Sequence, residues 1–449
     1  AAAAAAAEAK AKEEEEARLA CPPRHPNYRV AMLVPLLGPV PSYLPYFIAS
    51  AARASPLADF LIFHERTSIP WERPPNVKFV DLGGGGLAEL VGLKLGEQLN
   101  LPLRNATVLL RSLRHLFDKW PRLVAEYKPA FGVVFEDFLT GYSHWGYCDL
   151  DMVLGNLPFF IEAEELTNYD IVSYAFDDLH ALYLRGQWTV HRNDPPVINQ
   201  VWRQCAHLGS DLQKELAYKV TYLRQMEASG RRTFPTRFLS AEGCYSVQAL
   251  RSHLRIKLAY KQAVGAELQP NAALSQVLSV GGAVWHCAMS IAADAALLRT
   301  LIARTAQQPC RTSLPAAVQT TGDAAPLSVV IGEQAEGCGG WIPSEYRMCA
   351  SSLAHNASSV APRPAVFVSA REGSWSSTPV DETALEMPNG CRQHALFHFQ
   401  EWKKNWDEPS SAAGGGRSRI APLRPADTLS SPAFRITADG ISPLTIPQS

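Results

Sequence analysis

The chain has 449 residues, 47% of them hydrophobic, and a formal net charge of −1. A chain of this length can bury a substantial core and has room for one large or two ordinary domains. The balanced charge gives no indication of a nucleic-acid partner or of binding to an anionic membrane surface. The nine cysteines lie far apart, which excludes the short Cys-x-x-Cys units of zinc ribbons and of thioredoxin-like sites.

The amino-terminal region combines low complexity with an apolar stretch. Residues 1–26 begin with an alanine run and continue with charged residues, which predicts a solvated low-complexity arm that would suit a stem. Residues 28–52 are apolar, but four prolines interrupt them, so the pattern favours a strand, a turn and a helix over a membrane span. Because the chain begins with alanine, a membrane anchor upstream of the given sequence is compatible with this pattern.

Strand-like and helical segments alternate from residue 27 onward. Apolar or alternating runs predict strands at residues 28–37, 58–65, 76–82, 144–154, 169–176 and 187–192. Helices are predicted at residues 46–54, 106–127, 211–228 and 246–264, the second with a break at Pro121. This order is typical of βαβ units, so we expect an α/β fold with a mostly parallel sheet flanked by helices over residues 27–304.

The composition changes after residue 304. Residues 305–390 are rich in Ala, Pro, Ser, Thr and Gly with weak periodicity, which predicts an irregular low-complexity insert. Residues 391–408 regain aromatic and charged side chains, so we expect them to return to the core. Gly, Ser and Pro dominate residues 409–449, which predicts a disordered tail.

Two aspartates stand out at the end of the fourth predicted strand. If the strand continues through them, Asp149 and Asp151 project to one face while Leu150 turns back into the core. Two unpaired carboxylates are costly to desolvate, so the spacing indicates a shared Mg²⁺ or Mn²⁺ ion with open positions for phosphates. Gly155 and Asn156 follow as a turn at which the backbone can approach a ligand. Solvated or helix-capping aspartates are the alternative.

Four residues elsewhere could take part in the same chemistry. Lys128, near the start of an apolar helix, could pair with a diphosphate. His398 alternates with aromatic residues and could be a third metal ligand that favours Mn²⁺, with the basic pair at 403–404 behind it to meet phosphate. Arg192 could contact a sugar, and Glu242 is the candidate general base. For each of them an ordinary structural or solvated residue is the alternative.

The segment KPAFGVVFEDFLTGYSHWGYCDLDMVLGNL, residues 128–157, resembles a family of uncharacterised glycosyltransferase-like proteins of the GT-A type. The likeness covers about residues 28–250 and returns at LFHFQEWKK, residues 396–404. The resemblance implies a GT-A-like, Rossmann-like core and a metal-ligand role for His398. QWTVHRN is also similar to a segment of the family, which strengthens Arg192 as a candidate.

The residues and the resemblance together predict a metal-dependent glycosyltransferase. It would move a sugar from a nucleotide diphosphate sugar to a glycan or another hydroxyl acceptor, with the aspartate pair and His398 holding Mn²⁺ or Mg²⁺. Pro35, Leu36 and Leu37, at the end of the first strand, would lie beside the nucleotide, because ligands bind at the carboxyl ends of parallel strands.

Other functions stay open at this point. A catalytically inactive GT-A-like module would bind a glycan or a nucleotide without turnover, and a nucleotidyltransferase would release pyrophosphate. The run Gly83–Gly86 formally fits a dinucleotide-binding pattern, but no acidic residue follows at the required distance, so a flexible turn is predicted. Asn-x-Ser/Thr sequons at Asn105 and Asn356, with the stem-like arm, favour the Golgi or another secretory lumen over the cytoplasm.

Overall fold

The computed structural model describes residues 27–175, 184–230, 241–265, 275–288, 294–306, 329–331, 348–350, 365–369, 375–379, 390–400, 402–406, 419–423, 428 and 433–444. The predicted arm 1–26 lies outside these residues, as does most of the predicted insert 305–390. Within the described part, no helix is both long enough and apolar enough to cross a membrane.

The core is a nine-stranded sheet with the order β15-β14-β8-β6-β7-β4-β1-β2-β3. Its strands are β1 (Val30–Leu36), β2 (Ala58–His64), β3 (Val77–Asp81), β4 (His144–Cys148), β6 (Ile171–Ala175), β7 (Trp188–Arg192), β8 (Ile256–Tyr260), β14 (Ala365–Ser369) and β15 (Trp375–Pro379). β1 to β4, β6 and β8 share one direction, while β7 runs antiparallel to its neighbours β4 and β6. The prediction of an α/β fold with a large, mostly parallel sheet is therefore confirmed.

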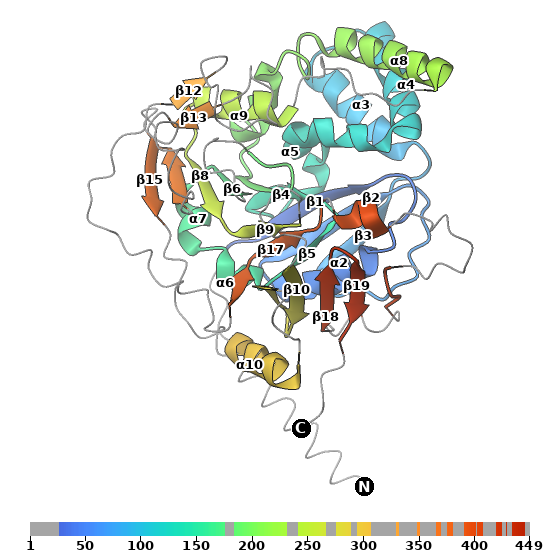
Figure 1. Cartoon of the computed structure of the whole chain (residues 1–449). Helices are drawn as coiled ribbons and strands as arrows, with labels where there is room; N and C mark the ends of the chain where they lie inside the picture. Colours follow the sequence, from blue (N-terminus) through green and yellow to red (C-terminus); the bar gives the residue numbers. More distant parts are fainter. Residues whose placement is uncertain are drawn as a thin grey trace, which may run out of the picture.

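The central strand β1 is covered on both faces. Ala31 and Leu33 pack with helices α3 (Gly86–Gln98) and α4 (Leu103–Lys119), whereas Val30 and Met32 pack with α2 (Leu44–Ala51). Successive strand residues point to opposite faces, so a strand covered on both sides needs the continuous apolar run that this segment has. Figure 1 shows α3, α4, α5 (Phe131–Val134) and α8 (Leu212–Ser229) grouped on one side of the sheet.

The remaining helical segments are short. They are η1 (Ala52–Ala54), η2 (Pro121–Ala130), η3 (Glu136–Phe138), α6 (Leu157–Phe160), α7 (Ala163–Asn168), η4 (Ile198–Gln204), α9 (Ala241–Arg251), α10 (Ala295–Ala306) and α12 (Trp402–Trp406). The predicted break at Pro121 is confirmed, because α4 ends two residues before it and a 3-10 segment follows. The predicted helix 246–264 is correct only as far as Arg251, where α9 ends, because Ile256 begins the strand β8 and Gln262 the strand β9.

The predicted strand 144–154 is divided in the structure. β4 ends at Cys148, and β5 (Met152–Leu154) begins three residues after Asp149. β5 belongs to a separate three-stranded sheet with the order β5-β17-β9, formed with β17 (Leu396–His398) and β9 (Gln262–Val264). Asp149 and Asp151 therefore lie on the connection between two sheets, which means that alternation along one strand does not explain why they face each other.

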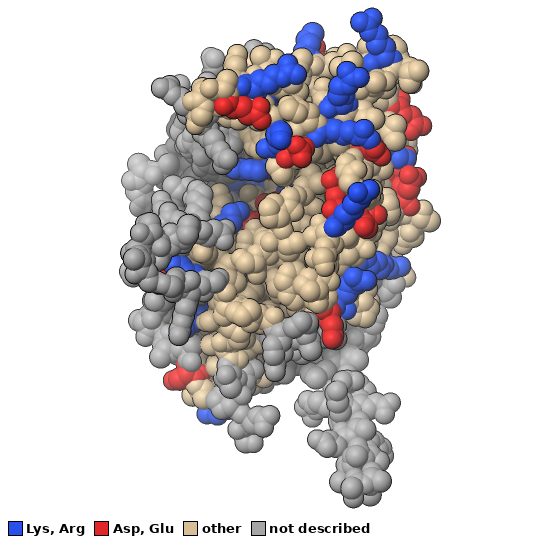
Figure 2. Space-filling view, turned by 90° about the vertical axis from the view of Figure 1, so that its right-hand side faces the viewer, with Lys and Arg blue, Asp and Glu red and all other residues tan. Residues whose placement is uncertain are grey.

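A five-stranded sheet of order β16-β11-β10-β18-β19 completes the described part. Its strands are β10 (Ser275–Val280), β11 (Ala283–Ala288), β16 (Cys391–His394), β18 (Phe434–Thr437) and β19 (Gly440–Pro443), and β12 (Val329–Ile331) pairs with β13 (Met348–Ala350) elsewhere. β18 and β19 correct the prediction that residues 409–449 are a disordered tail, since Phe434, Ile436 and Ile441 are buried in an apolar cluster. Figure 2 shows acidic and basic side chains interspersed on one face of the molecule, in keeping with the balanced net charge.

Candidate metal centre

The backbone on both sides of the aspartate pair is held by neighbouring strands. The amide of Asp149 donates to the carbonyl of Gln187, 3.3 Å away, just before β7. The carbonyl of Asp151 accepts from the amide of Phe399, 3.1 Å away, just after β17. The connection between the two sheets is therefore fixed at each aspartate by a different sheet.

His398 reaches the aspartates through strand pairing. It is the last residue of β17, where it lies opposite Met152 on β5, and its carbonyl accepts from the amide of Gly265 at 2.8 Å. Met152 directly follows Asp151, so the antiparallel register brings His398 beside the aspartate pair although the residues are far apart in the sequence. The imidazole Nε2 lies 3.1 Å from Asp151 Oδ1 and 3.9 Å from Asp149 Oδ2.

These three side chains form a group that could hold a metal ion. One ligand atom from each, two carboxylate oxygens and one imidazole nitrogen, lie within 4.8 Å of one another. Asp151 and His398 are buried, while the side chain of Asp149 is 31% exposed, so the group opens to solvent on one side. An open position and a mixed oxygen and nitrogen ligand set fit a divalent cation that also binds a substrate.

Two lysines hold the outer oxygens of the aspartates. Lys128 Nζ donates to Asp149 Oδ1 at 2.5 Å and to the carbonyl of Gly186 at 2.8 Å, and its side chain is 5% exposed. Burial lowers the pKa of the Lys128 ammonium, but Asp149, together with Glu242 and Cys148, raises it, and the net shift is upward. Lys403 Nζ donates to Asp151 Oδ2. Burial raises the pKa of Asp151, but His398 and Lys403 outweigh it and hold that pKa well below its usual range.

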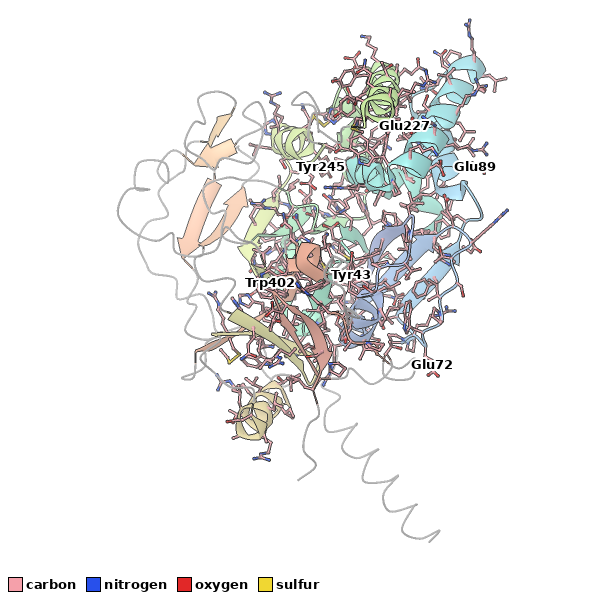
Figure 3. The ribbon with its side chains drawn as sticks, turned by 45° about the vertical axis from the view of Figure 1, so that its right-hand side comes forward. Tyr43, Glu72, Glu89, Glu227, Tyr245 and Trp402 are labelled. Atoms are coloured by element: carbon pink, nitrogen blue, oxygen red, sulfur yellow. A yellow bond between two sulfur atoms is a disulfide. The ribbon has the colours of Figure 1, made fainter. Side chains whose placement is uncertain are left out.

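The structure brings Glu242 to the same place from helix α9. A β carbon built on Gly186 would lie 1.9 Å from Glu242 Oε1 and 3.6 Å from Lys128 Nζ, so the carboxylate and the ammonium approach the same glycine. Burial raises the pKa of Glu242, Lys128 lowers it, and Asp149 raises it again, with a net upward shift. In Figure 3 the label Tyr245 marks this helix, α9.

Sequence reasoning did not identify Gly186. The residue stands just before the predicted strand 187–192 and carries no chemical group that a motif search would select. The sequence did contain one indication of its role, a glycine just before a strand. A glycine at such a position often allows another group to approach the backbone closely.

The end of β1 lies at the same edge of the sheet as the aspartates. β1 and β4 are parallel with Leu33 opposite Tyr147, so Pro35 and Asp149 each follow this pair by two residues. Pro35 is half-buried, Leu36 is buried and Leu37 is half-buried. Pro35 and Leu37 therefore leave part of their surface open at the carboxyl edge of the sheet.

Gly155 and Asn156 have structural partners. A β carbon on Gly155 would lie 2.6 Å from the carbonyl oxygen of His394, and the amide of Gly155 donates to the carbonyl of Ala395 at 2.8 Å. The close approach at this glycine is thus to the segment that leads into β17. Asn156 directly precedes α6, and its carbonyl accepts a hydrogen bond from the amide of Phe160.

The structure does not bring Arg192 to the metal group. β7 is antiparallel to β4, with Arg192 opposite His144 at the beginning of β4, whereas Asp149 follows the end of that strand. Arg192 pairs with Asp170 at this opposite edge, and Asn193 donates to the carbonyl of Tyr142 there. The prediction for Arg192 rested on its place at the end of a predicted strand and on a resemblance, while the direction of β7 decides the edge on which the residue lies.

A family model matches part of the chain. Residues 119–223 match the model of a family of unknown function (DUF6625). The match contains Lys128, Asp149 and Asp151, but neither Glu242 nor His398. No curated protein matches the chain.

Proposed function

We propose that this protein is a metal-dependent glycosyltransferase with a GT-A-like core, which transfers a sugar from a nucleotide diphosphate sugar to a glycan or another hydroxyl acceptor. The observation that carries the proposal is the group formed by Asp149, Asp151 and His398 at the carboxyl edge of a mostly parallel sheet. That edge is where open α/β sheets bind nucleotides. The likeness of residues 128–157 to glycosyltransferase-like proteins supports the same conclusion.

The chemistry of the proposal is electrostatic. Mn²⁺ or Mg²⁺ held by the three ligands would neutralise charge on the two phosphates as the sugar leaves. Lys128, buried and fixed by two hydrogen bonds, provides a second positive charge on the same side. Glu242 lies beside Lys128 with a raised pKa, which suits a group that accepts a proton from an acceptor hydroxyl.

The same proposal includes a secretory compartment. Two disulfides, Cys205–Cys244 and Cys287–Cys391, join segments that are distant in the sequence. Disulfides of this kind persist in oxidising compartments such as the secretory lumen. Together with the two sequons they support the Golgi or a neighbouring lumen.

The proposal is tested by calorimetric binding of UDP and GDP to the wild type and to Asp151→Asn, each with and without Mn²⁺. Binding that requires Mn²⁺ in the wild type and is lost in the variant supports the site. Asp211→Asn is the matched control, because Asp211 is partly exposed and pairs with Lys214 away from the metal group. Absence of binding of either nucleotide to the wild type would contradict the proposal. Release of pyrophosphate, measured with sugar donors and acceptors, would instead indicate a nucleotidyltransferase.

A further inference from the structure

Each of the two aspartates has one carboxylate oxygen that faces His398 and a second that pairs with a lysine. Asp149 turns Oδ2 toward His398 and gives Oδ1 to Lys128, while Asp151 turns Oδ1 toward His398 and gives Oδ2 to Lys403. The two oxygens that face His398 and the imidazole nitrogen are the candidate metal ligands. Each of the other two oxygens pairs with a lysine ammonium. Two lysines therefore balance the charge of the two aspartates before any cation enters.

The two lysines differ in how firmly they are held. Lys128 is 5% exposed and also donates to the carbonyl of Gly186, which fixes its ammonium in the protein interior. The side chain of Lys403 is 34% exposed. Its ammonium can move into solvent without leaving a buried cation unpaired, whereas the ammonium of Lys128 cannot.

The backbone at Lys403 is anchored although its side chain is not. Lys403 follows Trp402, whose ring lies 5.2 Å from the ring of Phe397, and Trp406 of the same helix lies 5.0 Å from Phe399. Trp402 and Tyr43 are both labelled in Figure 3. Tyr43 in turn contacts Phe399, with ring centroids 5.1 Å apart. Helix α12 therefore keeps Lys403 at the mouth of the site whether or not its ammonium touches Asp151.

We propose that Lys403 is an internal counter-cation that competes with the divalent metal for Asp151, so that the metal binds weakly alone and strongly together with an anionic diphosphate. This inference rests on the metal site of the proposed function. A divalent ion adds two positive charges beside the ammonium of Lys403, which already pairs with Asp151, and like charges at such distances repel strongly outside bulk water. A diphosphate supplies the missing negative charge and gives the displaced Lys403 a new partner. Coupling of this kind is reciprocal, so Mn²⁺ must also tighten nucleotide binding.

The test is Mn²⁺ binding measured by electron paramagnetic resonance, without nucleotide, in the wild type and in Lys403→Met. The variant keeps an unbranched apolar stem but loses the charge, so Mn²⁺ should bind about tenfold more tightly. Lys403→Arg retains the charge and should bind Mn²⁺ like the wild type. Lys214→Met, a change at an exposed lysine that pairs with Asp211, controls for the altered net charge. Lys403→Gln is the second uncharged variant if Lys403→Met does not fold.

Saturating UDP completes the thermodynamic cycle. It should tighten Mn²⁺ binding by a larger factor in the wild type than in Lys403→Met, because the variant has no internal cation to displace. Equal or weaker Mn²⁺ binding by both uncharged variants would overturn the inference and leave the metal site intact. If Asp151→Asn binds Mn²⁺ as the wild type does, the metal site itself, and with it the proposed function, is wrong.

Discussion

Gly155 and His394 approach so closely that a β carbon on the glycine would lie 2.6 Å from the histidine carbonyl oxygen. The contact joins the end of β5 to the turn that leads into β17, the strand that carries His398. Gly155→Ala should push these backbones apart, because neither atom belongs to a flexible side chain. We expect a loss of roughly 1–3 kcal/mol in the free energy of unfolding. Mn²⁺ binding should weaken as well, and unchanged denaturant midpoint and Mn²⁺ affinity would contradict the role of this contact.

The disulfide Cys287–Cys391 ties β16, and through it His398, to β11. Cys391→Ser should lower the free energy of unfolding by about 2–4 kcal/mol. It should also weaken Mn²⁺ binding, since β16 leads directly into β17. Cys205→Ser breaks a second disulfide of the described residues, which joins the end of η4 to α9, and serves as the matched control. If both variants reduce Mn²⁺ affinity equally, the effect is general destabilisation, and the proposed link from Cys391 to His398 fails.

Glu242 should make stability depend on pH. Its pKa is raised by burial above the ordinary value of 4.5, so the folded state disfavours the ionised carboxylate. Below about pH 4 the group is protonated in both the folded and the unfolded state, and wild-type stability decreases as the pH rises through the folded pKa. Glu242→Gln removes this loss. The variant should therefore gain stability relative to the wild type between pH 4 and pH 8 in denaturant unfolding, whereas the exposed Glu227→Gln should show no such trend.

Replacing Arg192 tests whether this residue takes part in donor binding. The residue pairs with Asp170 at the edge opposite the metal group, and Arg255 donates to the same carboxylate. Arg192→Met should lower the free energy of unfolding by roughly 1 kcal/mol, because its ion pair is partly exposed and Asp170 keeps a second partner. Mn²⁺-dependent UDP binding should stay at the wild-type value. A large loss of UDP affinity without loss of stability would place Arg192 in the donor site after all.

Local spacing predicted β1 to β4, β6 and β7, and only part of the site. The apolar runs identified β1 and β2 because a strand buried on both faces is apolar at nearly every position. Asp149 and Asp151 were selected as a pair from alternation along one strand, yet they face each other because the chain leaves β4 and enters a second sheet. The local pattern made His398 only a candidate ligand, and a resemblance strengthened it, since no local pattern shows which distant strand will pair with β5. The direction of a strand and its pairing partner depend on residues far away in the sequence. The antiparallel direction of β7 is the reason why Arg192 lies away from the site.

Gly186 controls where the carboxylate of Glu242 lies. A β carbon there would collide with Glu242 Oε1 at 1.9 Å, but that oxygen is the end of a flexible side chain that can rotate away. Gly186→Ala should therefore cost less than about 1 kcal/mol of stability, because the displaced group retains freedom to move. Glycosyl transfer should decrease by about tenfold or more if Glu242 is the base, since general bases typically contribute at least that much. The double variant Gly186→Ala/Glu242→Ala should then be no slower than Glu242→Ala alone, because both changes remove the same group. Additive losses of rate would show that Gly186 acts independently of Glu242.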